Sequence, residues 1–378
     1  MQGDHMKPEK FIVNIPQSEI DDLKYRLGHA RLPKALDGKP WSSGPELDFM
    51  QDVAAYWREK YDWRKAEAEI NSFDNYKVTI NDVEIHFVHQ KNENPKAKTI
   101  LLTHGWPDSF YRFHAVIPML AKDYNVVVPS LPGYGFSAPK GMGSKRIADI
   151  WAQLMKDTLG YEEFFAVGGD TGAPVTIALA RQHPDITKAI HLTDVGWGMV
   201  DEADLKPAEK KFQEETSAWY WSEGAYTMMH ATKPMTLAYA LNDSPVGLAA
   251  WAASFANRGK DHNYVDEAFG GRDAFLTTMS IYWFTGTIGS AMQMYKEEAA
   301  QNMSAGWGEE PKATPKCEVP TALTIYPNDA HVPKEWAERQ GLNVQRYTVM
   351  DKGGHFAAME LPEVFVSDIK AAFNELDS

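Results

Sequence analysis

An aspartate flanked by glycines has the surroundings of an enzymatic nucleophile. Asp170 lies in the string GGDTG at residues 168–172, after the apolar run 164–167 and before a helical stretch. Strand, tight turn and helix in this order form a nucleophile elbow, here with aspartate in the position that serine often takes. The small neighbours permit a strained turn, and the start of the following helix favours an ionised carboxylate. Because GxDxG alone also fits an ordinary Asp-Gly turn, the hypothesis that Asp170 attacks a substrate depends on its partners.

A second motif, HGWP at residues 104–107, directly follows the β-rich run 99–103. A loop in this position supplies half of the oxyanion hole in enzymes with a nucleophile elbow. We therefore expect the backbone N–H groups of Trp106 and Thr171 to converge on the reacting atoms. His104 is expected to be a packed structural histidine rather than a catalytic one.

The expected base and acid lie late in the chain. His355, in GGHF at residues 353–356, is the histidine whose place suits the chain order nucleophile, acid, histidine. Asp329 follows a β-rich run and is predicted to orient His355. Asp194, which also follows a predicted strand, is the alternative acid, and chain position does not separate the two well.

The elements that must position these groups begin with an N-terminal arm. Residues 11–33 contain a predicted helix start at Ser18, with an acidic residue three positions later, and a second helix is predicted around 47–59. Residues 76–88 alternate apolar and polar types through the Asn-Asp pair at 81–82, which predicts a β-hairpin. The sheet is expected to begin there.

Beyond the hairpin, short β-rich runs alternate with helical ones, a pattern typical of βαβ units and a parallel sheet. The predicted strands are 99–103, 125–128, 164–167, 189–192, 322–326 and 345–349, with helices near 113–121, near 146–159 and after Gly172. Residues 200–302 interrupt this alternation, because they are helical in pattern and rich in Trp, Tyr, Phe and Met. The fold class is therefore α/β with a mostly parallel sheet, divided into an arm (7–75), a core (76–199), an inserted helical cap (200–302) and the rest of the core (303–378).

The amino-acid composition limits the kinds of partner that the chain is expected to bind. The 378 residues carry a formal charge of −14 with a pI near 5.3, which disfavours nucleic acid or an anionic membrane surface as the main partner. Cys317 is the only cysteine, so no intramolecular disulfide can form and a cytoplasmic location is expected. No apolar stretch approaches the length of a membrane span, so no membrane anchor is expected. The first six residues, MQGDHM, have the character of a cloning remnant. A homodimer is possible on the sequence alone.

These motifs together resemble the epoxide hydrolases of the α/β-hydrolase superfamily, in particular the branch with an N-terminal arm that includes microsomal and juvenile-hormone epoxide hydrolases. The resemblance spans nearly the whole chain. Besides GGDTG and HGWP, it rests on the arm at 11–33, ATKPMTLAYALNDSPVGLAAW at 231–251, IYWFTGTIGS at 281–290 and GGHFAAME at 353–360.

The resemblance implies two cap tyrosines that donate protons to the epoxide oxygen. The matching positions are Tyr282, in IYWFTGT, and Tyr226, in EGAYTMMHATKP, where alanine replaces the family's usual glycine and the register could slip to Tyr220. The resemblance also carries the acid over to Asp329, where the microsomal members have glutamate. The chain departs from those members in having no stretch that resembles their membrane anchor, which favours a soluble enzyme. Thr171 departs from the tryptophan that many members carry beside the nucleophile, which leaves the pocket shape open.

The sequence thus predicts an enzyme that converts an apolar epoxide to a vicinal diol, with the epoxide and water as partners and no metal or organic cofactor. Asp170 attacks an epoxide carbon while the tyrosines protonate the oxygen, and His355 then activates the water that cleaves the ester. Two alternatives stay open: a haloalkane or haloacid dehalogenase with the same nucleophile, against which Thr171 speaks, and a catalytically silent binding protein of the same fold. Detoxification is the expected role, beside catabolism and biosynthesis.

Overall fold

A computed structural model of the chain describes residues 7–196, 203–303 and 315–377, so the MQGDHM start and part of the predicted junction between core and cap lie outside the described residues. At its centre is a nine-stranded sheet in the order β1-β2-β3-β5-β4-β6-β7-β8-β9. The strands are β1 (Glu9–Lys10), β2 (Asn75–Ile80), β3 (Val83–Gln90), β4 (Thr99–Thr103), β5 (Asn125–Pro129), β6 (Phe164–Gly168), β7 (Thr187–Leu192), β8 (Pro320–Ile325) and β9 (Asn343–Val349). Strand β1 pairs with β2, β2 with β3, and β3 with β5, all antiparallel. The remaining neighbours, in the order β5-β4-β6-β7-β8-β9, are all parallel.

Local sequence explains both parts of this sheet. The β2–β3 hairpin turns at Asn81 and Asp82, whose φ angles of 50° and 60° suit a two-residue turn that matches the strand twist. Strand β6 is buried along its whole length, as expected for a parallel strand covered on both faces, and it reads FFAVG without polar alternation. The predicted hairpin and parallel sheet are therefore confirmed.

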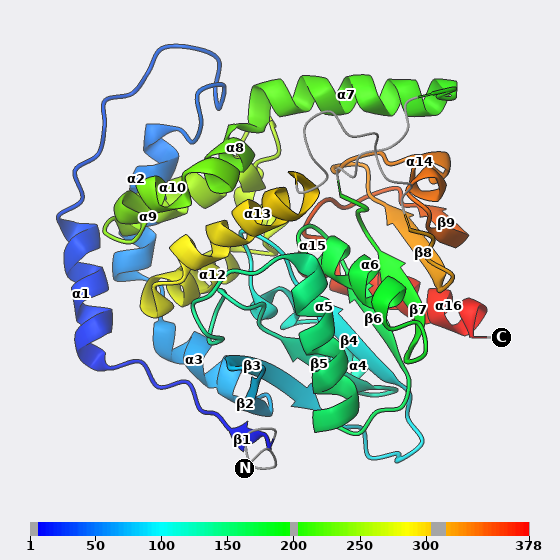
Figure 1. Cartoon of the computed structure of the whole chain (residues 1–378). Coiled ribbons are helices and arrows are strands. Elements are labelled where there is room, and N and C mark those ends of the chain that lie inside the picture. The colour runs from blue at the N-terminus through cyan, green and yellow to red at the C-terminus, as the bar shows by residue number, and fades with distance from the viewer. Residues whose placement is uncertain (1–6, 197–202, 304–314, 378) are drawn as a thin grey trace.

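Helices cover the sheet and form a separate layer beside it (Figure 1). Between the core strands lie a 3₁₀ turn (Phe110–Phe113), α4 (Ile117–Leu120), α5 (Ser144–Gln153), a π-helical turn (Leu154–Thr158), α6 (Gly172–Gln182) and α14 (Lys334–Arg339). After the last strand follow α15 (Ala357–Glu360) and α16 (Pro362–Leu376). Between β7 and β8 come α7 (Pro207–Glu223), α8 (Ala225–Thr232), α9 (Pro234–Leu241), α10 (Pro245–Ala256), α11 (Val265–Ala268), α12 (Arg272–Thr285) and α13 (Ile288–Met303). Among the described residues, this insertion contains no strand, in agreement with the helical pattern of its sequence.

The N-terminal arm touches both the sheet and the inserted helices. It contains α1 (Gln17–Gly28), α2 (Leu47–Glu59) and α3 (Trp63–Asn71). β1 extends the sheet edge, α1 and α2 pack against α10, and α3 packs against α12 (Figure 1). The buried Trp57 indole donates to the Ser280 hydroxyl at 3.1 Å, so its apolar area is buried without an unpaired N–H. The arm therefore holds the inserted helices against the core.

Three details of the predicted elements were wrong. The first helix begins at Gln17 behind Pro16, so Ser18 lies inside it and does not cap it. The predicted helix 113–121 is instead a 3₁₀ turn followed by the four-residue α4, and helix α3 was not predicted. Helix α3 carries a local signal that was overlooked, because the Asp62 side chain caps it by accepting the N–H of Arg64 at 3.0 Å.

Candidate active site

Asp170 occupies a strained turn between β6 and α6. Its φ of 52° lies in the left-handed region, which non-glycine residues seldom adopt and which occurs often at functional sites. The turn is also crowded: a Cβ on Gly105 would lie 2.5 Å from Asp170 Oδ1, and one on Gly172 would lie 2.3 Å from a backbone oxygen. The glycines of both motifs therefore allow the aspartate to stand against the HGWP loop.

The Asp170 carboxylate has one partner from each of the other two motifs. Its Oδ1 accepts the backbone N–H of Trp106 at 2.7 Å. Its Oδ2 lies 3.1 Å from Nε2 of His355. The side chain of Asp170 is 10% exposed and that of His355 is 4% exposed, so both lie in a region nearly free of bulk water. These two contacts hold the carboxylate in one orientation beside the HGWP loop and His355.

Asp329 binds the other nitrogen of His355. Its Oδ2 lies 2.9 Å from His355 Nδ1, and its Oδ1 accepts the N–H of Ala330 at 2.9 Å. Burial opposes ionisation of Asp329, but the positive charges of His355 and Arg258 outweigh it and lower the pKa of this carboxyl. For His355, burial disfavours the charged ring, yet the Asp329 charge and the contacts with Asp170 raise its pKa to about 9. The three side chains thus form a contiguous array, with the His355 ring between the carboxylates of Asp170 and Asp329.

Asp194, the alternative acid, lies nearby but does not contact His355. Its Oδ1 accepts the backbone N–H of Gly196 at 2.9 Å. Burial first, and then the charge of Asp329, raise the pKa of Asp194 to about 6. The geometry therefore places Asp329, and not Asp194, in the orienting position, and it leaves Asp194 as a second buried carboxyl beside the array.

An aromatic cluster covers the nucleophile. The Trp106 ring stacks on the Tyr226 ring with centroids 5.3 Å apart and an interplanar angle of 8°. Phe255 of α10 meets the rings of Trp106, Tyr226 and His355 edge-on at 5.0–5.4 Å. Tyr226, on α8, is only partly buried, although burial and the Asp170 charge raise the pKa of its hydroxyl. This combination indicates a ring that borders an internal space next to Asp170.

Tyr282 is not placed as expected. Its ring is 1% exposed, and its hydroxyl donates to the backbone oxygen of Asp108 at 2.7 Å. Because a phenol has one proton, this hydroxyl cannot donate to a substrate without giving up the bond that fixes the HGWP loop. The structure therefore corrects the assignment of Tyr282: the proton of its hydroxyl is used in a bond to the residue that follows HGWP.

Tyr295, which the sequence reasoning missed, lies beside Trp106 and Tyr226. It lies on α13, with its ring 6.2 Å from the rings of both Trp106 and Tyr226. Burial first, and then the charge of Asp170, raise its pKa well above the ordinary value, and its hydroxyl makes no hydrogen bond among the described residues. The spacing from Ala291 places it on the buried face of α13, which was the available signal.

Buried polar contacts hold the loops together. Arg112 Nη1 lies 2.6 Å from Asp108 Oδ2, and its Nη2 donates to the backbone oxygen of His355. The Asp108 carboxylate also accepts the N–H of Gly105 at 2.9 Å. His104 accepts the N–H of Leu131 at 3.0 Å through Nε2, so it is the structural histidine that was predicted. The HGWP loop and the His355 loop are thus tied to one arginine.

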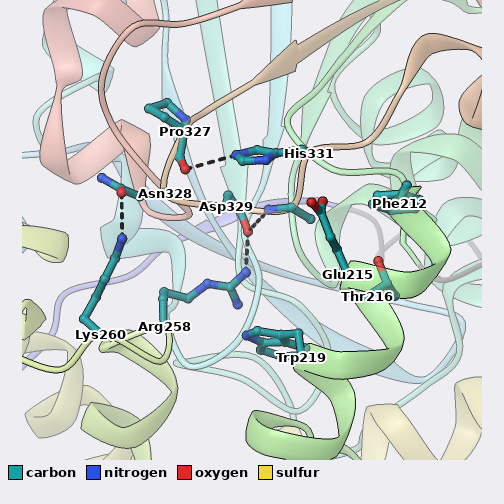
Figure 2. A pocket seen from close by; sticks show the side chains of 11 residues that line it. Phe212, Glu215, Thr216, Trp219, Arg258, Lys260, Pro327, Asn328, Asp329 and His331 are labelled. Atoms are coloured by element: carbon teal, nitrogen blue, oxygen red, sulfur yellow. Dashed lines mark hydrogen bonds and ion pairs between the residues drawn. The ribbon is translucent and has the colours of Figure 1, made fainter. Parts of the chain in front are cut away.

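Two cavities adjoin the array. The inner one, about 30 Å³, is bordered by Asp170, His355, Asp194 and Tyr226 and is large enough for water. The outer one, about 240 Å³, lies between α7 and the loop after β8 (Figure 2). The two share Phe212, Trp219, Arg258, Asp329 and Ala330. The array therefore sits below a larger space that reaches toward the inserted helices.

The described residues contain no cluster of three or more His, Cys, Asp or Glu side chains that could hold a metal ion. Across the same ranges, no helix combines the length and apolar character that crossing a membrane requires.

The sheet order, the strained Asp170 turn and the Asp329–His355 pair are those of an α/β-hydrolase with an aspartate in the position of the nucleophile elbow. Comparison with known proteins agrees: the family described as "Epoxide hydrolase N terminus" matches residues 8–113, and that described as "alpha/beta hydrolase fold" matches residues 98–362. Epoxide hydrolase 1 of Sus scrofa is 33% identical over 95% of this chain and 87% of its own length. The chain therefore belongs to the epoxide hydrolase family.

Solved structures agree with this assignment. Juvenile hormone epoxide hydrolase of the silkworm Bombyx mori matches with a TM-score of 0.86 and 25% identity, over 98% of this chain and 95% of that one. Aspergillus niger epoxide hydrolase matches with a TM-score of 0.84 and 28% identity, over 98% and 96%. The resemblance inferred from the motifs and the predicted fold class are confirmed.

Proposed function

We propose that the chain converts an apolar epoxide to a vicinal diol through a covalent ester on Asp170. The observation that carries this proposal is a buried carboxylate held by the Trp106 N–H and His355, with two partly exposed cap tyrosines above it. In the first half-reaction an Asp170 oxygen attacks one epoxide carbon. The carbon–oxygen bond of the ring breaks, and the ring oxygen takes a proton.

Tyr226 and Tyr295 supply that proton in our proposal. Their pKa values are raised by burial and by the Asp170 charge, so both phenols stay protonated at neutral pH. An epoxide oxygen leaves as a strongly basic alkoxide, which even a weakly acidic phenol can protonate when it is correctly positioned. Tyr226 belongs to the segment predicted from the sequence, whereas Tyr295 replaces Tyr282 in this role.

The second half-reaction uses His355 as the base. In the free enzyme its pKa of about 9 reflects two neighbouring carboxylates. Once Asp170 has become a neutral ester, one of these charges is gone, so the pKa falls and the ring can accept a proton from water. The water oxygen adds to the ester carbonyl, the N–H groups of Trp106 and Thr171 stabilise the resulting oxyanion, and the diol leaves with the oxygen that Asp170 contributed.

The substrate is apolar in this proposal, because rings of Trp106, Phe255 and Tyr226 surround the reacting carboxylate. A halide leaves without a proton, so a dehalogenase has no need for two phenols above its nucleophile. The buried free thiol of Cys317 is compatible with the cytoplasmic location that we propose, together with a role in detoxification. A homodimer stays open.

The test is a single turnover with excess enzyme in ¹⁸O-labelled water, using a panel of alkyl and aryl epoxides. The proposal expects a diol whose new oxygen is ¹⁶O, with the label found in Asp170 after proteolysis and mass spectrometry. A diol that carries ¹⁸O in the first turnover would show direct attack by water. Turnover of haloalkanes without any turnover of epoxides would favour the dehalogenase alternative.

A further inference from the structure

Arg258 reaches from the inserted helices to the acid of the catalytic array. Its Nη2 lies 2.5 Å from Asp329 Oδ1, and the two side chains are 11% and 8% exposed. The guanidinium also lies over the Trp219 ring at 5.0 Å and the Phe255 ring at 5.1 Å from their centroids. Figure 2 shows Arg258 between Asp329 and Trp219, with α7 on the far side of the cavity. The charge is therefore held by an ion pair and by two aromatic rings.

The backbone at Arg258 is unusual for an arginine. The residue follows Asn257, the cap of α10, and has a φ of 54° in the left-handed region, where a helix end most often has glycine. The Asn257 side chain fixes this turn, because it donates to the Lys260 oxygen at 2.6 Å and accepts the N–H of Tyr264 at 2.8 Å. A long side chain in such a conformation points to a role for that side chain.

Arg258 completes the hydrogen bonding of the acid. Asp329 Oδ1 receives Arg258 and the Ala330 N–H, while Oδ2 receives His355. We propose that Arg258 is a positioning residue for the hydrolytic half-reaction: it fixes the plane of the Asp329 carboxylate and thereby the orientation of His355. This inference rests on the proposed function, since it concerns the step in which the base activates water.

The charge of Arg258 acts on the same base. Around His355 lie the carboxylates of Asp329, Asp170 and Asp194, and Arg112 binds its backbone oxygen. The carboxylates favour the protonated ring, whereas the positive charge of Arg258 opposes protonation and lowers the pKa of His355. After Asp170 has become an ester, Arg258 therefore helps to keep His355 neutral and able to act as a base.

A second carboxylate lies near Arg258. Burial raises the pKa of Glu223, at the end of α7, and the positive charge of Arg258 offsets part of this effect. No ion pair or hydrogen bond joins the two among the described residues, whereas Asp329 is in direct contact. The pairing that matters for the base is therefore the one with Asp329.

The experiment separates the two half-reactions by quenched flow with wild type, Arg258→Met and Arg258→Lys. For Arg258→Met we expect ester formation near the wild-type rate, and ester hydrolysis slower by roughly 10-fold to 100-fold because the base is misplaced. The pH at which ester hydrolysis is half-maximal should move upward, because the charge that opposed protonation of His355 is lost. Arg258→Lys should recover part of both effects.

Lys260 provides the matched control. It is a cation two residues away that borders the same outer cavity, but it bonds Asn328 at 2.8 Å instead of the acid (Figure 2). Lys260→Met should leave the hydrolysis rate and its pH profile unchanged. Wild-type hydrolysis and pH profile in Arg258→Met would overturn the proposal, as would equal losses in both half-reactions, which a purely structural role predicts. Absence of any ester in the wild type would instead refute the proposed function.

Discussion

Among the described residues, Asp329 and Asp368 each lie at the centre of a buried cluster with one histidine and one arginine, as Asp108 does beside the HGWP loop. In the first, Asp329 joins His355 to an arginine of the inserted helices. In the second, Asp368 of α16 binds Nε2 of His191 on β7 at 2.8 Å and Nη1 of Arg346 on β9 at 2.6 Å. Their bond lengths and side-chain burial are similar. A buried histidine–aspartate pair is therefore not by itself a catalytic signature.

What distinguishes the clusters is the second nitrogen of each histidine. Nε2 of His355 lies 3.1 Å from the carboxylate of Asp170, which occupies a strained turn. Both residues border a cavity. Neither of these second nitrogens makes a hydrogen bond of good geometry among the described residues, but only that of His355 lies within ion-pair distance of another carboxylate. In the other cluster, Asp368 on α16 instead accepts a hydrogen bond from Thr324 of β8. The same pair of residue types thus supports chemistry where a nucleophile and a space meet it, and supports packing where neither does.

Removal of the nucleophile should give the largest effect. Asp170→Ala leaves the glycines of the elbow but deletes the attacking oxygen, so we expect turnover to fall by a factor on the order of 10⁶, as for other lost nucleophiles. Diol formation by the purified variant, with circular dichroism as the check on folding, measures this. A folded variant that still forms diol at the wild-type rate would mean that the cluster beside Asp170 is no more catalytic than the Asp368 cluster.

Loss of the base should stall the enzyme halfway. His355→Gln can still open the ring, because that step uses Asp170 and the tyrosines, but no group then removes the proton from water. Steady-state turnover should fall by roughly 10⁴-fold, as when members of comparable arrays are removed. Intact-protein mass spectrometry should show one covalently bound substrate per chain. Epoxide consumption without such an adduct would contradict the assigned role.

The proton donors come next in size. The double variant Tyr226→Phe/Tyr295→Phe keeps both rings and deletes both hydroxyls, so ester formation should slow by about 10²-fold or more, within the range of general acid catalysis. Tyr282→Phe loses only the bond to the Asp108 oxygen and should cost about 1 kcal/mol of stability. Stopped-flow measurement of alkylation distinguishes them. A larger loss of alkylation rate in Tyr282→Phe would restore the assignment made from sequence.

The elements around Asp170 could be predicted because their signals are local. The β-hairpin at Asn81, the apolar β6 and the glycines beside Asp170 each determine their own backbone conformation. The choice between Tyr282 and Tyr295 could not be made in this way. Both lie on helices of the insertion, α12 and α13, which are separated by a left-handed Gly286, and long-range packing decides which face meets the nucleophile. The contact of Arg258 with Asp329 has the same origin, since 71 residues separate the two.

The smallest effect on turnover should come from the second cluster. Asp368→Asn keeps the shape of the side chain but removes its charge from Arg346, and a buried pair that loses one partner typically costs roughly 3 kcal/mol or more of stability. His191 and Thr324 make contacts with Asp368 that the amide can keep only in part. Both half-reactions of the folded variant should proceed at nearly the wild-type rate, because no atom of this cluster touches Asp170.

The stabilisation that Asp368 provides should depend on pH. Burial opposes ionisation of Asp368, but the bonds from His191, Thr324 and Arg346 outweigh it, so the pKa of the carboxyl is lower in the folded chain than in the unfolded one. Its contribution to the free energy of unfolding is therefore fully present above the unfolded pKa of about 3.9 and is lost as the pH falls further. Urea unfolding at several pH values should show the largest gap between wild type and Asp368→Asn near neutrality, shrinking below about pH 4. A gap that is independent of pH would mean that the charge of Asp368 is not what stabilises the fold. If the folded Asp368→Asn variant loses turnover, the distinction between the two clusters fails. That distinction requires that only His355, whose second nitrogen faces Asp170, takes part in the chemistry.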